Sequence, residues 1–138
     1  MEVTAADIAD IPAGNLRVPR AEFAAVWIRA ENLHDQRAMR RVSDWYGAGV
    51  VATCRWLARA TIRPGNGPSH PARSPVTGHV EAYQSLIESE YIEATSLALR
   101  RPQPTLLAQR PGWIEGIEAT LLWAWHHHRD PPLEIHHT

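Results

Sequence analysis

The chain has 138 residues, of which 44% are hydrophobic and 21% are charged, and its formal net charge is −1. A chain of this length buries enough surface to fold as one domain without a metal or disulfide framework. The near-neutral charge argues against a general affinity for nucleic acids, which normally requires a clear basic excess. The single cysteine, Cys54, excludes an internal disulfide and a cysteine-based zinc site.

The N-terminal segment, residues 1–18, is acidic and lacks the apolar stretch of a secretory signal. The longest uncharged apolar run, from Trp45 to Cys54, is about half of what a membrane-spanning helix requires. We therefore expect a cytoplasmic protein that forms one helical domain over residues 1–138. Residues 1–18 and 130–138 are expected to be extended or flexible tails.

Proline spacing indicates where the helices lie. Because proline breaks helices, long blocks without it are the candidate helical regions. Three such blocks cover residues 20–63, 76–101 and 112–130. Strand signals are weak, since no alternation of β-branched residues runs beyond a few positions.

The first block predicts two helices. An apolar stripe at helical spacing from Phe23 to His34 predicts a helix over residues 20–33. Asp35 has the side chain of a helix cap and would begin a second helix over residues 36–61. The second half of that helix is apolar on most sides, so we expect it to be the central helix of the domain.

A Pro/Gly-rich loop over residues 62–78 follows, and its length is unusual for a compact domain. The next apolar stripe predicts a helix over residues 79–100. After a possible turn at 105–109, a last helix is predicted over residues 112–128. About four helices with apolar faces predict an all-α fold, a small helical bundle.

Glu90 is the most unusual single residue, because it stands in the middle of the apolar face of the helix predicted over 79–100. Glutamate is rarely buried without a partner. We expect either a salt bridge with an arginine such as Arg55, an interface position, or a functional carboxylate. Burial would raise the pKa of such a carboxyl group toward values useful to a general acid. Tyr83, on the same face, is a candidate neighbour.

Histidines and carboxylates suggest two candidate metal sites. Glu31 and His34 lie one helical turn apart, as in carboxylate-bridged di-iron bundles, but the second such pair is missing. The other candidate ligands come from the C-terminal region: His126, His128, His136 and His137. Consecutive histidines on a helix diverge, so a metal would require the tail to fold back over the double proline. Otherwise the imidazole side chains end the last helix by meeting its last carbonyl groups. No specific cofactor is indicated.

The Pro/Gly loop offers donors for an anion such as phosphate. The candidate residues are Arg63, Gly65, Gly67, Arg73 and Thr77. The loop lacks the lysine and spacing of a phosphate-binding loop, so a plain surface loop is the alternative. No nucleophile motif or metalloprotease motif is present, and the sequence identifies no catalytic residue.

Trp123 departs from the buried face of the last predicted helix. Aromatic residues and arginines dominate the energetic centres of protein interfaces. Trp123 is therefore either part of an ordinary solvated face or an exposed anchor on an interaction surface. The rim of such a surface would come from Arg100 and Arg101, or from Arg37, Arg40 and Arg41.

Three functions are compatible with the sequence. The first is an interaction protein, either an adaptor or a regulatory subunit and possibly self-associating, with an exposed apolar patch that includes Trp123. The second is a metal- or small-ligand-binding bundle, possibly an enzyme, that uses Glu90 with Glu31 and His34 or with the C-terminal histidines. The third is a nucleic-acid-binding protein that uses its arginines and stackable tryptophans.

Overall fold

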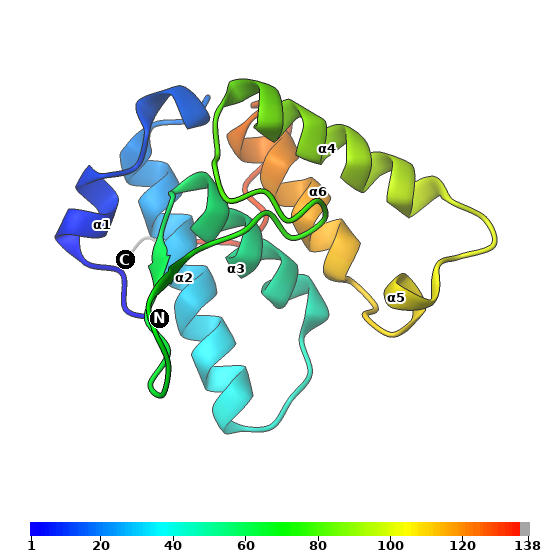
Figure 1. Cartoon of the computed structure of the whole chain (residues 1–138), viewed down its shortest axis with the longest axis horizontal. Coiled ribbons are helices and arrows are strands. Elements are labelled where there is room, and N and C mark those ends of the chain that lie inside the picture. The colour runs from blue at the N-terminus through cyan, green and yellow to red at the C-terminus, as the bar shows by residue number, and fades with distance from the viewer. Residues whose placement is uncertain (136–138) are drawn as a thin grey trace.

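A computed structural model describes residues 1–135 and shows an all-α bundle, which confirms the expected fold class (Figure 1). Two short strands form the one sheet within these residues. The elements in chain order are α1 (Ala5–Ala9), the 3-10 turn η1 (Ala13–Asn15), α2 (Arg20–Met39), α3 (Trp45–Leu57), β1 (Thr61–Ile62), β2 (His70–Pro71), α4 (Gln84–Leu99), α5 (Thr105–Ala108) and α6 (Trp113–Ala124).

The centre of the fold is the contact between α3 and α6. Gly49 of α3 lies against the backbone of Trp113, and Gly116 of α6 lies against the backbone of Tyr46. A Cβ atom at either glycine would collide with a carbonyl oxygen of the other helix. The two helices therefore meet backbone to backbone, which requires glycine at both positions.

Each of these helices also contains a buried threonine next to the contact, and its hydroxyl group is hydrogen-bonded within the helix. The hydroxyl of Thr53 donates to the carbonyl of Gly49, and that of Thr120 donates to the carbonyl of Gly116, both at 2.8 Å. Bonding to the preceding turn removes the cost of burying an unpaired hydroxyl.

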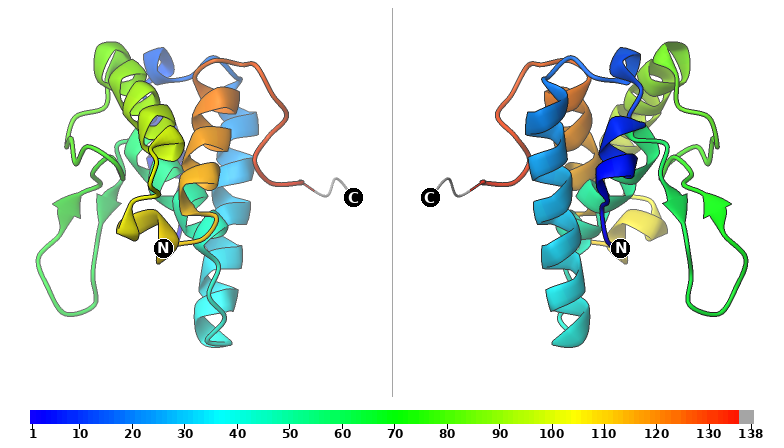
Figure 2. Two further views of the ribbon diagram at one scale, coloured as in Figure 1. Left: turned by 90° about the vertical axis from the view of Figure 1, so that its right-hand side faces the viewer. Right: turned by 90° about the vertical axis from the view of Figure 1, so that its left-hand side faces the viewer.

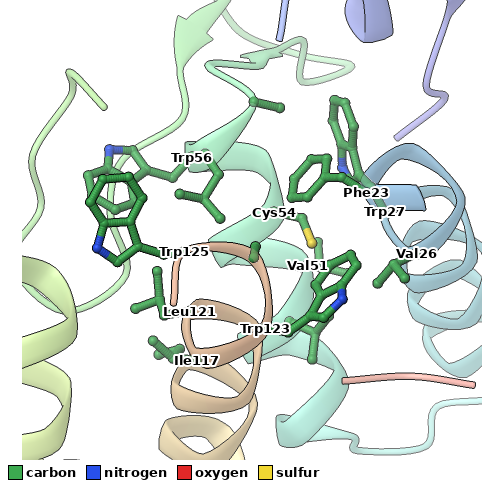
Figure 3. Close-up of a cluster of buried hydrophobic side chains, with 14 of the residues drawn as sticks. Phe23, Val26, Trp27, Val51, Cys54, Trp56, Ile117, Leu121, Trp123 and Trp125 are labelled. Atoms are coloured by element: carbon green, nitrogen blue, oxygen red, sulfur yellow. The ribbon is translucent and has the colours of Figure 1, made fainter. Parts of the chain in front are cut away.

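The remaining long helices cover this pair from two sides. α2 packs against α3, and α4 packs against α6, so α2 and α4 lie on opposite sides of the bundle (Figure 2). Large aromatic side chains fill the space between the helices (Figure 3). The rings of Phe23 and Trp123 stack with centroids 6.1 Å apart, which joins α2 to α6 directly.

The predicted break at residues 32–35 is wrong, because α2 continues to Met39. No proline or glycine interrupts that stretch, so nothing in it ends a helix. Asp44, rather than Asp35, caps the next helix: its Oδ1 accepts a hydrogen bond from the amide of Gly47 at 3.0 Å.

The later helices are shorter than predicted. The helix expected over residues 79–100 begins only at Gln84, and the one expected over 112–128 ends at Ala124. The loop predicted over residues 62–78 includes most of the short β1–β2 hairpin, and α5 lies at the turn predicted over 105–109.

The N-terminal residues pack onto the bundle, which corrects the expectation of an extended tail over residues 1–18. Ile11 is only 1% exposed and belongs to the core. The side-chain amide of Asn15 donates to the carbonyls of Leu57 at 2.9 Å and Ala82 at 3.1 Å. This segment therefore ties the end of α3 to the approach to α4.

At the other end of the chain, the hydroxyl of Tyr46 donates to the carbonyl of Pro132 at 2.9 Å. Leu133 and Ile135 pack against the core. None of the helices in residues 1–135 is long and apolar enough to cross a membrane.

Candidate functional site

Glu31 forms a buried ion pair with Arg55. The guanidinium of Arg55 makes two hydrogen bonds of 2.7 Å to the carboxylate, and Trp27 Nε1 donates to it at 3.0 Å. Burial by itself raises the pKa of Glu31, but the hydrogen bonds and positive charge of Arg55 and of the Met1 amino group lower it below its usual value. Glu31 is therefore a fully occupied structural carboxylate, and Arg55 is not the partner of Glu90.

Glu90 is fully buried, as predicted, but its partners lie in the loop before α4. Oε2 accepts from the amide of Val76 at 2.8 Å. Oε1 accepts from the amide of Thr77 at 3.0 Å and from its hydroxyl at 2.7 Å. Neither Arg55 nor Tyr83 hydrogen-bonds Glu90 in the part of the chain that the structure describes, and Tyr83 is 44% exposed. Glu90 thus fastens a loop to α4.

The predicted anion-binding residues do not come together. Arg63, Gly65 and Gly67 lie in the exposed hairpin loop, and a guanidinium nitrogen of Arg73 donates to the carbonyl of Gly78 at 3.2 Å. Thr77 does bind an anion, but that anion is the protein's own carboxylate at Glu90. Arg73 and Thr77 therefore donate to acceptors of the protein itself.

The candidate metal ligands are also dispersed. His34 lies at the junction of α2 and α3. His126 Nε2 lies 3.3 Å from Glu88 Oε2, and the ring of His126 packs against that of Tyr91 at 4.4 Å between centroids. His128 is exposed beyond the end of α6. Over residues 1–135, no three histidine, cysteine, aspartate or glutamate side chains are grouped to hold a metal ion. His136 and His137 lie outside the described residues.

Helix α6 ends differently from the prediction. Its last carbonyls accept the backbone amides of His126 and His128 rather than imidazole nitrogens. His127 adopts a left-handed φ of 51°, which reverses the chain at this point.

Trp123 is only 3% exposed, so the expectation that it is a surface anchor is wrong. Five of the six tryptophans are buried, and Trp45 is half-buried. The stacking surface that a nucleic-acid-binding function relied on is therefore not formed by these residues. Arg100 and Arg101 are exposed just after the end of α4.

A pocket of about 240 Å³ lies where α2 ends and α3 begins, and we call it the elbow pocket. Its lining residues are His34, Arg37, Ala38, Val42, Ser43, Asp44, Trp45 and Ala48. Met39, the last residue of α2, is 85% exposed, and Val42, on the connection to α3, is 53% exposed. Arg40 and Arg41 of the same connection are also exposed.

Side-chain contacts hold the two arms of the elbow pocket together. A guanidinium nitrogen of Arg37 lies 2.8 Å from Asp44 Oδ2, while the other oxygen of Asp44 caps α3. The guanidinium of Arg110 lies 5.4 Å from the ring centroid of Trp45. Because the only acidic residue of the lining is already paired, the rim around Arg40 and Arg41 is positively charged.

A second surface, uncharged and with two exposed apolar side chains, lies on the side of α4 that faces away from α6. It consists of Ser85, Ser89, Ile92, Ser96 and Leu99, which we call the outer face of α4. Ile92 is 52% exposed and Leu99 is 72% exposed. A solvent-facing helix surface usually carries charged residues, and this one has none in its central stripe.

Sequence reasoning missed both surfaces, because the apolar residue that it expected to be exposed, Trp123, lies in the core. The signal for the outer face of α4 is present in the sequence as an uncharged stripe at helical spacing. The elbow pocket has no such signal, since it depends on where α2 ends.

No family model, no curated protein and no solved structure matches this chain. The functional argument therefore rests on the residues and their geometry.

Proposed function

We propose that this protein is a helical adaptor or regulatory subunit that binds a partner protein at the elbow pocket. The observation that supports this function is an open pocket whose exposed lining is largely apolar. Met39, at the end of α2 beside the pocket, is 85% exposed. Contiguous exposed apolar surface of this kind is typical of protein interaction sites.

The chemistry of the pocket indicates the kind of partner. Trp45, Val42 and two alanines surround a space that accepts an apolar side chain, and such an anchored side chain is the usual centre of an interface. The flexible thioether of Met39 adapts to different partner shapes. Arg40 and Arg41 favour a partner segment with acidic residues beside its apolar anchor, and these rim charges accelerate association.

A site-specific photo-crosslinking experiment tests this function. The full chain is expressed in its own host with a photoreactive amino acid in place of Met39, and adducts are identified by mass spectrometry. We expect a discrete protein adduct that disappears when Val42→Asp is added, because a carboxylate at the rim opposes both an apolar anchor and an acidic partner. The variant should keep its melting temperature, since Val42 is more than half exposed.

The matched control carries the photoreactive residue at Ser69, which is also exposed, in the hairpin loop. Identical adducts at positions 39 and 69, or an adduct at position 39 that survives Val42→Asp, would contradict the proposal. Once a partner is identified, Arg40→Glu with Arg41→Glu should lower its association rate more than its dissociation rate changes.

A further inference from the structure

We infer that the outer face of α4 binds the same face of a second copy of this chain, with the two helices antiparallel about a two-fold axis at Ile92. This surface is separate from the elbow pocket, and the inference does not rest on the proposed adaptor function.

The spacing of the outer face is that of a helix–helix seam. Ser85, Ser89, Ile92, Ser96 and Leu99 follow one another at intervals of four, three, four and three residues. Their mean spacing of about 3.5 residues per turn keeps a stripe facing one partner helix along its whole length. A helix face that is exposed only to water does not need this regular spacing, and it normally carries charged residues.

The opposite face of α4 is already occupied within the monomer. Ile87 and Ala94 are fully buried on the side that packs against α6, and Glu90 is fastened to the preceding loop. Figures 1 and 2 place α4 at the margin of the bundle, with no other helix beyond it. The apolar side chains of Ile92 and Leu99 are therefore available to another molecule.

The outer face is complementary to itself when one copy is reversed. With a two-fold axis at Ile92, this residue packs against its own copy, and Leu99 of each chain lies opposite Ser85 of the other. The small serine makes room for the large leucine, so the helices approach closely at both ends. A two-fold contact of this kind uses one patch twice, which is the commonest arrangement in homodimers.

Charge selects the antiparallel direction. Glu81 is exposed just before the N-terminal end of α4, whereas Glu88 is already bonded to Trp125 and His126 of its own chain. Arg100 and Arg101 flank the C-terminal end. Antiparallel pairing brings the acidic end of one helix beside the basic end of the other, whereas parallel pairing places like charges together.

The size of the surface sets the expected affinity. A helix of 16 residues is about 24 Å long, so the outer face of α4 forms an interface near the small end of the range for specific complexes. We therefore expect a dimer whose population rises with protein concentration rather than a permanent one.

Sedimentation equilibrium of the full chain over a range of concentrations tests for the dimer. We expect wild-type protein to dimerise and Ile92→Arg to raise the dimer dissociation constant at least tenfold. Ile28→Arg, a change of the same residue type at a 37% exposed position on α2, is the control and should leave the constant unchanged. A monomer at all concentrations up to about 1 mM, or an equal effect of both variants, would overturn the inference.

Cysteine crosslinking tests the direction of the helices. Cys54 is fully buried, and burial raises the pKa of its thiol, so it does not compete for mild oxidants. We expect Ile92→Cys to form a disulfide with its own copy. Ser85→Cys and Leu99→Cys should crosslink to each other when the two variants are mixed, but not when each is oxidised alone. Self-crosslinking of Ser85→Cys alone would show parallel helices and refute the antiparallel arrangement.

The two surfaces can be distinguished by the same variants. Ile92→Arg should abolish the dimer while keeping the crosslinked partner at position 39, and Val42→Asp should do the reverse. If Ile92→Arg leaves the dimer intact, the inference about α4 fails. If Val42→Asp leaves the crosslinked adduct intact, the proposed adaptor function fails.

Discussion

Two glutamates show how this chain places negative charge inside an apolar core. Glu31 is neutralised by the guanidinium of Arg55, whereas Glu90 is surrounded by backbone amides and a hydroxyl. In both residues each carboxylate oxygen accepts at least one hydrogen bond. A buried carboxylate is tolerated under this condition. Each carboxylate therefore ties neighbouring segments of the chain together.

Arg55→Met tests the importance of the ion pair. The variant keeps most of the apolar stem of Arg55 but leaves the buried Glu31 carboxylate with only the Met1 amino group as a cationic partner. Breaking a buried pair in this way typically costs 3–5 kcal/mol, and we expect about 3 kcal/mol at pH 7 because Arg55 is 21% exposed. The free energy of unfolding from urea titrations measures the effect.

The same variant should show a specific pH dependence. The pKa of Glu31 is lower in the folded protein than in the unfolded chain, so its stabilising contribution is present above its usual pKa and is lost as the pH falls through the lowered value. The difference in stability between wild type and Arg55→Met should be full at pH 7 and shrink below about pH 4. Arg59→Met, which removes a bond to the neutral carbonyl of Ala82, should show a difference that does not change with pH. A gap for Arg55→Met that persists unchanged at low pH would contradict this account.

Glu90→Gln tests the attachment of the loop to α4. Glutamine replaces one accepting oxygen with an NH₂ group, which then faces a donor at Val76 or Thr77. An unsatisfied buried donor costs about 1–3 kcal/mol, and we expect a loss of stability in that range. Hydrogen exchange at the amides of Val76 and Thr77 should accelerate more than exchange in α6. Glu93→Gln, at an exposed position of the same helix, is the control, and equal exchange in both variants would contradict the role of Glu90.

At the scale of the elements, the contact of α3 with α6 depends on the absence of two side chains. Gly49 and Gly116 each lie against a carbonyl oxygen of the facing helix, and backbone cannot move aside as the end of a flexible side chain can. These glycines therefore set the distance between α3 and α6, and the surrounding aromatic residues pack around the two helices at that distance.

Gly49→Ala and Gly116→Ala should therefore both destabilise the protein, although alanine favours helices more than glycine does. The added methyl group forces the helices apart, and overpacking of this kind costs about 1–3 kcal/mol or more. Gly65→Ala in the hairpin loop is the control, because an added Cβ there meets no atom within 4 Å. Thermal unfolding measures all three, and an unchanged melting temperature for Gly49→Ala would contradict the backbone contact.

At the scale of the whole molecule, the two proposed binding surfaces lie far apart. The end of α2 that lines the elbow pocket is at the bottom of Figure 1, and α4 lies in its upper part. A dimer formed through α4 would leave both elbow pockets open. Two identical sites on one particle increase the apparent affinity for a partner that is itself clustered or repeated, without any new contact.

The sequence by itself determined the helical class and placed Glu90 on the apolar face of its helix. Helix-forming stripes and prolines act locally, through backbone dihedral angles and hydrogen bonds within one turn, so their effects can be read from neighbouring residues. The boundaries were less accurate, because the chain offers caps at both Asp35 and Asp44 and only one of them is used.

Only the tertiary structure decided which groups meet. Glu90 lies beside Val76 and Thr77 rather than Arg55. Trp123 is buried because the ring of Phe23 from α2 stacks on it. Such contacts depend on the packing of residues distant in sequence. The elbow pocket belongs to the same class, since it exists only where the end of α2 meets the beginning of α3.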